Sequence, residues 1–215
     1  MSRIAIVGGH GKIAQKLTKI LTDGGHEVTS LIRKAEQTDE VESNGATAAV
    51  ADVESQTTEQ IAGSVTGHDA VVFAAGAGGG DADRTYAVDR DAAIRCADAA
   101  KSAGVQRFVL ISYFGAGMDH GVSPDDSFYA YAEAKAEADQ HVKNSDLAWT
   151  IVAPSSLTDG KGTGSITTKE QGATAESVSR DDVAAVIAAV LETPSTAGRM
   201  IEFNNGDTPI ADALA

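Results

Sequence analysis

The chain has 215 residues, a length that favours one domain with an elaborated end over two full domains. Its 17 Lys and Arg against 31 Asp and Glu give a formal net charge of −14, and so acidic a surface repels phosphate backbones and anionic lipid. We therefore expect no nucleic acid and no membrane as partners, and the 42% of hydrophobic residues excludes general disorder. The N-terminus does not resemble a signal peptide and Cys96 is the only cysteine, so a cytoplasmic location is expected.

Short apolar stretches alternate with longer segments of helical periodicity as far as Pro154. This alternation predicts an α/β fold in which crossover units build a doubly wound parallel sheet, buried on both faces. The strands are expected, in chain order, at residues 3–7, 28–32, 46–50, 69–75, 105–111 and 149–152. The helices are expected from the glycine turn after the first strand to Gly24, and at residues 57–62, 83–102 and 128–143.

Beyond Pro154 the pattern loosens into a segment rich in Gly, Ser and Thr. Further strands are expected at residues 165–168 and 199–203, and a helix at 181–192 for which Ser179 is the N-cap. No linker separates a second domain, so we expect a single domain over residues 1–215.

A glycine turn, Gly8-Gly9-His10-Gly11, follows the first strand and opens the first helix. Strand, turn and helix in this order are the context that a dinucleotide-binding fingerprint requires. Glycines let the backbone turn tightly beside a diphosphate, and the amide hydrogens at the helix start direct partial positive charge toward it. Glycines also end strands in other α/β proteins, but the context and the N-terminal position favour a nucleotide site. The residues expected to hold the dinucleotide here are Gly8, Gly9, His10, Gly11, Lys12 and Ile13.

The end of the second strand indicates the type of dinucleotide. An acidic side chain there would bind the ribose 2′-hydroxyl of NAD, but this chain has Arg33 and Lys34. A guanidinium pairs bidentately with a 2′-phosphate and Lys12 would add charge, so NADP is expected rather than NAD. The alternative is that Arg33 and Lys34 are a solvated surface pair. Asp52 and Val53 follow the third strand, where an adenine ring would lie, although Asp52 alone is better explained as a turn residue.

Tyr131 and Lys135 lie four residues apart in the helix expected after the fifth strand, so both side chains project from one helix face. A neighbouring ammonium and a cationic nicotinamide favour the phenolate of Tyr131, which makes it a proton donor and acceptor at neutral pH. Lys135 can also hold the ribose hydroxyls. The spacing equally suits a surface pair, and Tyr129 is a nearby competitor.

Other chemistry lacks a sequence pattern. The five histidines show no paired ligand spacing, so no metal site is expected, and no G-x-S-x-G elbow occurs. Cys96 falls within an Ala-rich helical stretch and is expected to be a buried small residue rather than a reactive thiol.

Together these motifs resemble the atypical short-chain dehydrogenases/reductases, in the NAD(P)-binding branch related to NmrA-like proteins and to flavin/biliverdin reductases. The resemblance covers nearly the whole chain. The matching positions are residues 7–14, Asp52, Ala74-Ala75-Gly76, Tyr131 with Lys135, residues 149–154 (W-T-I-V-A-P) and residues 179–184.

The resemblance implies a Rossmann-like sheet with a small C-terminal substrate cap from residues 155–215. It also implies cofactor contacts at Ala74, Ala75, Gly76 and Lys135, and a loop led by Pro154 that closes over the nicotinamide. Two departures stand out: Phe114 replaces a hydroxyl residue that orients the substrate carbonyl in extended relatives, which leaves Ser112 nearby, and Ala153 replaces an arginine.

Two functions remain open at this point. The first is an NADP-dependent reductase or epimerase/dehydratase-like enzyme for a small carbonyl, quinone or flavin-like acceptor, with Tyr131 as proton donor, Lys135 tuning it and Ser112 binding the acceptor. The second is a non-catalytic NADP(H)-binding redox sensor or regulatory protein. A scaffold with an empty site is a third reading.

The substrate itself is not encoded in a readable motif, because residues 113–126 and 155–172 would shape its pocket. The many charges on the long helices favour a monomer or weak homodimer. Examples are Asp83, Arg84, Asp89, Arg90 and Asp91.

Overall fold

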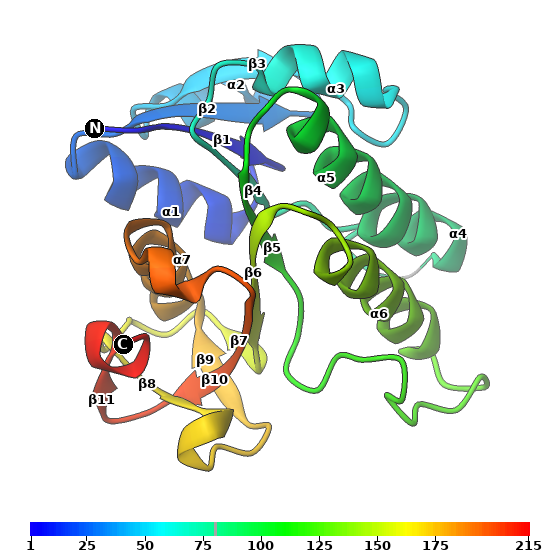
Figure 1. Cartoon of the computed structure of the whole chain (residues 1–215), viewed down its shortest axis with the longest axis vertical. Helices are drawn as coiled ribbons and strands as arrows, with labels where there is room; N and C mark the ends of the chain where they lie inside the picture. Colours follow the sequence, from blue (N-terminus) through cyan, green and yellow to red (C-terminus); the bar gives the residue numbers. More distant parts are fainter. Residues whose placement is uncertain (80) are drawn as a thin grey trace.

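The computed structural model describes residues 1–79 and 81–215, in which nine strands form one mostly parallel sheet (Figure 1). The strand order is β11-β8-β10-β6-β5-β4-β1-β2-β3. The mutually parallel run consists of β1 (Arg3–Val7), β2 (Glu27–Ile32), β3 (Thr47–Val50), β4 (Ala70–Phe73), β5 (Arg107–Ile111), β6 (Ala148–Pro154) and β10 (Arg199–Asn205). At the far edge β8 (Ser165–Thr168) is antiparallel to β10, and β11 (Thr208–Pro209) is antiparallel to β8. This sheet confirms the predicted α/β class with a Rossmann-like arrangement.

The strand order reverses at β1. The chain first moves outward from β1 to β2 and β3, then returns to β4 on the other side of β1 and continues through β5 and β6. Ile4 is accordingly paired with Val28 of β2 on one side and with Ala70 of β4 on the other. Open parallel sheets form a crevice outside the carboxyl ends of their strands at such a reversal, so a ligand site is expected at this edge of the sheet.

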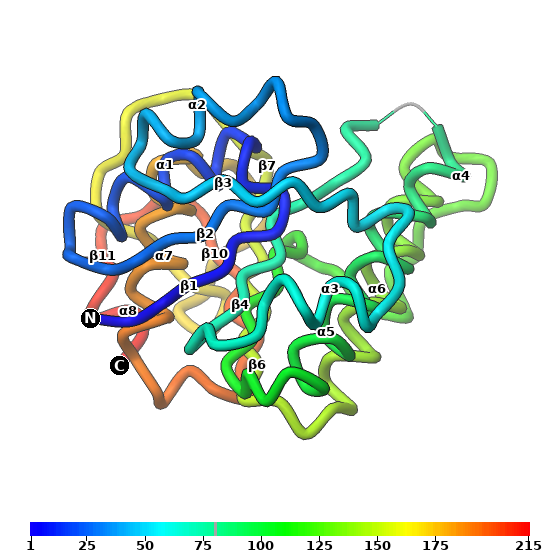
Figure 2. The backbone as a smooth tube through the Cα atoms, turned by 90° about the horizontal axis from the view of Figure 1, so that it is seen from above, coloured from blue at the N-terminus to red at the C-terminus, as the bar shows by residue number. Residues whose placement is uncertain are grey.

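Helices cover both faces of the sheet (Figures 1 and 2). One face carries α1 (Lys12–Asp23) and α7 (Arg180–Glu192), and the other carries α3 (Thr58–Val65), α5 (Ala93–Ser102) and α6 (Tyr129–Lys143). The α1 side chains that recur every three or four residues, Ala14, Leu17 and Leu21, are fully or almost fully buried against the sheet, and the helix ends at Gly24 as predicted.

The Ala-rich stretch predicted as one helix over residues 83–102 contains a π-helical insertion. It runs through α4 (Ala82–Thr85), the π-helical η2 (Tyr86–Ala92) and then α5. A π turn shifts which side chains face inward, and such turns are frequent at functional sites. Asp89 lies in η2 and is only 2% exposed, so this member of the charges named on the long helices does not contribute to the surface charge.

Cys96 on α5 is buried, as predicted, and burial raises the pKa of its thiol to about 12. The thiolate, which is the nucleophilic form, is therefore disfavoured at neutral pH.

After Pro154 the chain contributes both to the main sheet and to a small second sheet. β7 (Ser156–Thr158) pairs with β9 (Ser177–Ser179), whereas β8 and β10 extend the main sheet. Ser179 caps α7, because its hydroxyl accepts a hydrogen bond from the Asp182 amide at 2.9 Å, as predicted. The short helical pieces that the sequence pattern did not reveal are η1 (Ala35–Gln37), α2 (Thr38–Glu42), η3 (Lys169–Gln171), η4 (Pro194–Thr196) and α8 (Ile210–Ala213). None of the helices in the described residues combines the length and the apolar character needed to cross a bilayer.

Candidate functional site

The glycine turn after β1 packs directly against β2 and against the residue just after β4, the two strands that flank β1. Gly8 has φ of +79°, and a Cβ there would lie 2.6 Å from the Cα of Ala75, just after β4. A Cβ on Gly9 would lie 2.4 Å from the Cβ of Ser30 in β2. Both distances are far below a van der Waals contact, so only glycine lets the turn sit this close to the sheet.

The N-terminus of α1 is open to an anion. Its N-cap residue, Gly11, provides no side-chain hydrogen bond, and no acidic residue lies in the first turn. The first amides of a helix have no partner inside the helix and carry the positive end of its dipole. The backbone of the predicted turn is therefore suited to a diphosphate.

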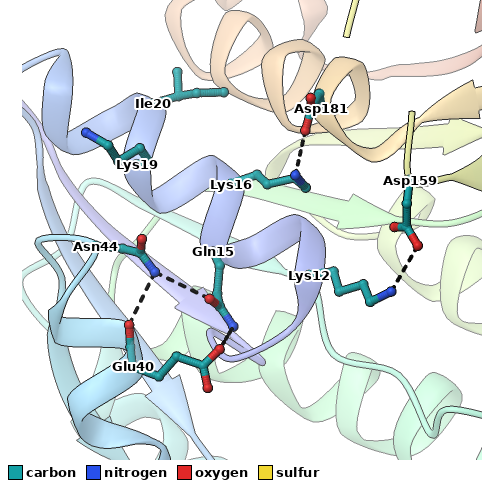
Figure 3. Close-up of a pocket in the computed structure, with 9 residues that line it drawn as sticks. All are labelled: Lys12, Gln15, Lys16, Lys19, Ile20, Glu40, Asn44, Asp159 and Asp181. Carbon is teal, nitrogen blue, oxygen red and sulfur yellow. Dashed lines mark hydrogen bonds and ion pairs between the residues drawn. The ribbon is translucent and has the colours of Figure 1, made fainter. Parts of the chain in front are cut away.

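The side chains of His10 and Lys12 point to other partners. His10 Nε2 lies 2.6 Å from Glu40 Oε2, and Lys12 Nζ lies 3.0 Å from Asp159 Oδ2. Lys12 belongs to a groove of about 660 Å³ on the outer side of α1, where Lys16 pairs with Asp181 (Figure 3). Because both side chains are paired with carboxylates, the backbone amides of His10 and Lys12 are the groups left to contact a diphosphate.

Two cavities follow the carboxyl ends of the strands. The first, the strand-end cavity, has a volume of about 210 Å³ and lies between the glycine turn and the ends of β2, β3 and β4. It brings together most of the predicted dinucleotide contacts: Gly8, His10, Gly11, Arg33, Asp52, Val53, Ala74, Ala75 and Gly76. Lys34 does not line it; its backbone amide donates a hydrogen bond to Gln37 Oε1 at 3.1 Å.

The second, the central cavity, has a volume of about 890 Å³ and borders the first along Ala74, Ala75 and Gly76, which line both. Its walls include Ile13 from α1 together with Tyr131 and Lys135 from α6. A third space of about 450 Å³, the cap-side cavity, shares Tyr131 and is lined by Ser112, Phe114 and Pro154. The structure therefore brings most of the predicted cofactor residues and the predicted catalytic residues to one edge of the sheet, whereas Lys12 and Lys34 line none of these three cavities.

Lys135 is held at the floor of the central cavity by two oxygen atoms. Its Nζ donates to the Ile111 carbonyl at 2.9 Å and lies 3.2 Å from Asp89 Oδ1, and the side chains of this ion pair are 4% and 3% exposed. The other Asp89 oxygen accepts from the Ala77 amide at 3.0 Å. Burial opposes the charged form of Lys135, but the negative charges of Asp89 and Asp139 help to raise its pKa, so the ammonium is retained.

Tyr131 is a neutral phenol in this setting. The Lys135 Nζ lies 5.8 Å from the centre of its ring, yet burial outweighs that positive charge and raises the pKa of Tyr131. Lys135 does lower the pKa of Tyr131, which is the predicted direction, but by less than burial raises it. The competitor Tyr129 is directed elsewhere, because its hydroxyl donates to Glu133 Oε1 at 3.0 Å.

The Ser112 hydroxyl is hydrogen-bonded to the carboxylate of Asp139, a residue that the sequence motifs did not identify. Its hydroxyl donates to Asp139 Oδ2 at 2.7 Å, and Asp139 is 1% exposed. Burial raises the pKa of Asp139 to about 6, although Ser112 and Lys135 act in the opposite direction. The other oxygen of Asp139 has no partner within the described chain. The only available signal was its spacing of four residues after Lys135 on the same helix.

The wall between the central and cap-side cavities is aromatic and apolar. The ring centroids of Tyr113, Phe128 and Tyr131 are 5.2 to 5.6 Å apart. Phe128 is 42% exposed and Leu157 is 38% exposed at the mouth of both cavities. Such a surface favours a flat, largely apolar ligand. Among the residues that the structure describes, no three His, Cys, Asp or Glu side chains form a group able to hold a metal ion.

Comparison with known proteins places the chain in a family. Residues 8–194 match the NAD(P)H-binding family. The uncharacterized sugar epimerase YhfK of Bacillus subtilis (strain 168) is 35% identical over 217 residues, which cover 99% of this chain and 98% of that protein. A Bacillus halodurans structure, provisionally named an NAD-dependent epimerase/dehydratase, is 35% identical with a TM-score of 0.91, covering 100% of this chain and 99% of its own. The oxidoreductase ylbE of Lactococcus lactis is 30% identical with a TM-score of 0.88, covering 99% and 94%.

The chain therefore belongs to the NAD(P)H-binding family of oxidoreductase-like and epimerase-like proteins. This confirms the resemblance inferred from the sequence motifs.

Proposed function

We propose that the protein is an NADP-dependent reductase that transfers a hydride to a small carbonyl, quinone or flavin-like acceptor. The observation that carries this proposal is the shared lining of the two cavities. Ala74, Ala75 and Gly76 border both the strand-end cavity and the central cavity, so a dinucleotide lying along the strand ends would extend from Arg33 to Tyr131 and Lys135.

The residues present fit that cofactor. The glycine turn and the open start of α1 suit the diphosphate, and Arg33 lies at the rim where a 2′-phosphate would be bound. When bound, the dinucleotide supplies the hydride, and oxidation of its nicotinamide balances reduction of the acceptor. Lys135 holds ribose hydroxyls from the floor of the cavity, and Tyr131 gives its hydroxyl proton to the acceptor oxygen.

The aromatic wall supports a planar acceptor over a polyol sugar. Tyr113, Phe128 and Leu157 offer an apolar surface on which a planar ring would pack, and Ser155, Ser156 and Arg180, which also line the cap-side cavity, would be left to bind polar substituents of that ring. A quinone or flavin-like ring therefore fits the proposed site better than the sugar named for the Bacillus subtilis relative.

The cofactor part is tested by calorimetric titration with NADPH and NADH. We expect the wild type to bind NADPH more tightly than NADH. Arg33→Ala should weaken NADPH binding by about tenfold, since a charge-assisted hydrogen bond is lost, and should change NADH binding little. Lys34→Ala is the matched control, because this neighbouring cation does not line the cavity. Equal affinity of the wild type for both dinucleotides would overturn the NADP assignment.

The chemical part is tested by NADPH oxidation with menadione, FMN and 4-nitrobenzaldehyde. Tyr131→Phe is expected to slow carbonyl reduction by about 100-fold and to leave FMN reduction nearly unchanged, because a flavin does not need this proton donor. Tyr129→Phe is the control, since its hydroxyl is bound to Glu133. Full carbonyl turnover by Tyr131→Phe would remove the proposed role of this residue.

A second candidate function is a sensor of the NADPH/NADP ratio. The observation favouring it is that Ser112 directs its only hydroxyl proton to Asp139 and that Phe114, at the position where the resemblance to extended relatives implies a hydroxyl residue, lines the same cavity, so polarisation of a substrate carbonyl would be weak. Tight NADPH binding without consumption of NADPH by any of the three acceptors would favour the sensor over the reductase.

A further inference from the structure

The rim of the strand-end cavity carries an acidic side chain among its cations. Glu54 lies just after β3 and is one of the lining residues, together with Arg33 from the end of β2 and Arg84 from α4. Neither Glu54 nor Arg84 was expected from the sequence, because they are remote from the glycine turn along the chain. Their meeting follows from the sheet order, which places the ends of β2, β3 and β4 at one edge.

The carboxylate of Glu54 lies between two guanidinium groups. Its Oε2 is 3.4 Å from Arg84 Nε and 3.9 Å from Arg33 Nη1. The three side chains are 31%, 36% and 44% exposed, so they border the opening of the cavity.

The backbone around Glu54 is tied down on both sides. The Glu54 amide donates to Asp52 Oδ1 at 3.2 Å, and Arg95 Nη2 donates to the Val53 and Glu54 carbonyls at 2.9 and 3.2 Å. Arg84 is anchored too, since its Nη1 donates to the Ala77 carbonyl. The carboxylate is thus presented to the arginines from a fixed segment.

We propose that Glu54 is a specificity-determining residue whose carboxylate competes with the 2′-phosphate of NADP for Arg33 and Arg84. This inference rests on the proposed function, because it assumes that a dinucleotide occupies the strand-end cavity. A 2′-phosphate carries nearly two negative charges and binds the same guanidinium donors that Glu54 faces. To bind, the 2′-phosphate must displace the Glu54 carboxylate from Arg33 and Arg84, and it is still repelled by the negative charge of that carboxylate. The uncharged 2′-hydroxyl of NADH neither displaces the carboxylate nor is repelled by it. Glu54 accordingly lowers the ratio of the NADPH affinity to the NADH affinity, which Arg33 raises.

The test compares the wild type with Glu54→Gln, which keeps the side-chain shape and removes the charge. NADPH and NADH are each titrated by calorimetry at low ionic strength. Glu54→Gln is expected to tighten NADPH binding by about two- to fivefold, the range of a partly exposed ion pair, and to change NADH binding by less than that.

The matched control is Glu42→Gln on α2, which removes an exposed carboxylate outside all of the cavities described above. It should leave the ratio of the two affinities unchanged. A thermal melt of each variant checks that the fold is intact, and since Glu54 is at the surface rim both are expected to melt with the wild type.

The outcomes separate this inference from the proposed function. Equal changes for NADPH and NADH, or no change, in Glu54→Gln would overturn the role of Glu54 while dinucleotide binding stands. Binding of neither dinucleotide by the wild type would overturn the proposed function and this inference with it. Weaker NADPH binding in Glu54→Gln would show that the carboxylate positions the arginines rather than competing for them.

Discussion

Two buried carboxylates lie near Lys135, so the predicted pair of Tyr131 and Lys135 belongs to a larger network of charged and hydrogen-bonded side chains. Asp89 contacts the ammonium directly and Asp139 binds Ser112 one helical turn further along α6. One cation thus offsets part of the charge of two buried acids, which is why burial still leaves the pKa of Asp139 raised. The site is preorganised around Lys135, with Tyr131 at its edge.

The residue scale also shows what the sequence could not provide. Tyr131 and Lys135 were predictable because their spacing is local to one helix. Asp89 was not, since its burial depends on the π-helical register of η2, and Glu54 was not, since its partners come from distant segments. Local pattern identifies residues on one element, whereas contacts between elements depend on how the whole sheet is assembled.

Asp139 gives a pH-dependent prediction at this scale. Its pKa in the folded protein is raised from 3.8 to about 6, so the folded state binds a proton more tightly than the unfolded state. The stabilisation from this proton is complete below pH 3.8 and is lost as the pH rises through about 6. Asp139→Asn has no such proton. Between pH 4 and pH 7 the free energy of unfolding of the wild type should therefore fall, relative to Asp139→Asn, by up to about 3 kcal/mol.

Urea denaturation of both proteins at intervals across this pH range measures the difference. Asp39→Asn, an exposed aspartate at the start of α2, is the control and should show no comparable trend. A constant difference between the wild type and Asp139→Asn at all pH values would contradict the raised pKa.

At the scale of elements, the long apolar strands were the most predictable part of the fold. Apart from the arginine that begins β1 and β5, the strands β1, β4 and β5 are continuous and largely buried apolar runs, and the predicted strands match their bounds within two residues at either end. The short strands β7 and β9 were missed because they have three residues each and consist largely of Ser and Thr, without a hydrophobic period. β7 and β9 form through contacts with elements distant in the chain, and a local sequence pattern does not predict such contacts.

The turn between β1 and α1 provides the second prediction. Gly9→Ala places a Cβ 2.4 Å from the Ser30 Cβ inside β2, so the turn or the strand must move. We expect a loss of about 1–3 kcal/mol in the free energy of unfolding. Gly63→Ala in α3 is the matched control: nothing lies within 4 Å of its added Cβ, so alanine should stabilise that helix by about 0.5–1 kcal/mol. Urea denaturation compares the two variants, and equal stability of Gly9→Ala and the wild type would show that the turn does not pack as described.

At the scale of the whole molecule, both ends of the chain build the sheet, since β10 lies beside β6 and the crevice follows the reversal at β1. Residues 155–215 were predicted as a small substrate cap. In the structure Leu157 and Ala175 of this segment line the cap-side cavity, while β8, β10 and β11 extend the main sheet. The crossover order was predictable from alternation, but the placement of this last segment depends on edge pairing with β6.

The net charge of −14 leads to the last prediction. Repulsion among the excess carboxylates destabilises the compact state, and raising the salt concentration from 0.01 to 0.15 M shortens the screening length from about 30 Å to about 8 Å. The exposed ion pairs that salt also weakens, such as Lys19 with Asp23, contribute little. At pH 7.5 the melting temperature should therefore rise by about 2–4 °C with salt. Near the sequence pI of about 4.6 the net repulsion vanishes, so the same salt step should leave the melting temperature unchanged or lower it. Calorimetric scans in KCl at both pH values measure this, and an equal rise at both would assign the effect to general salt action instead of charge.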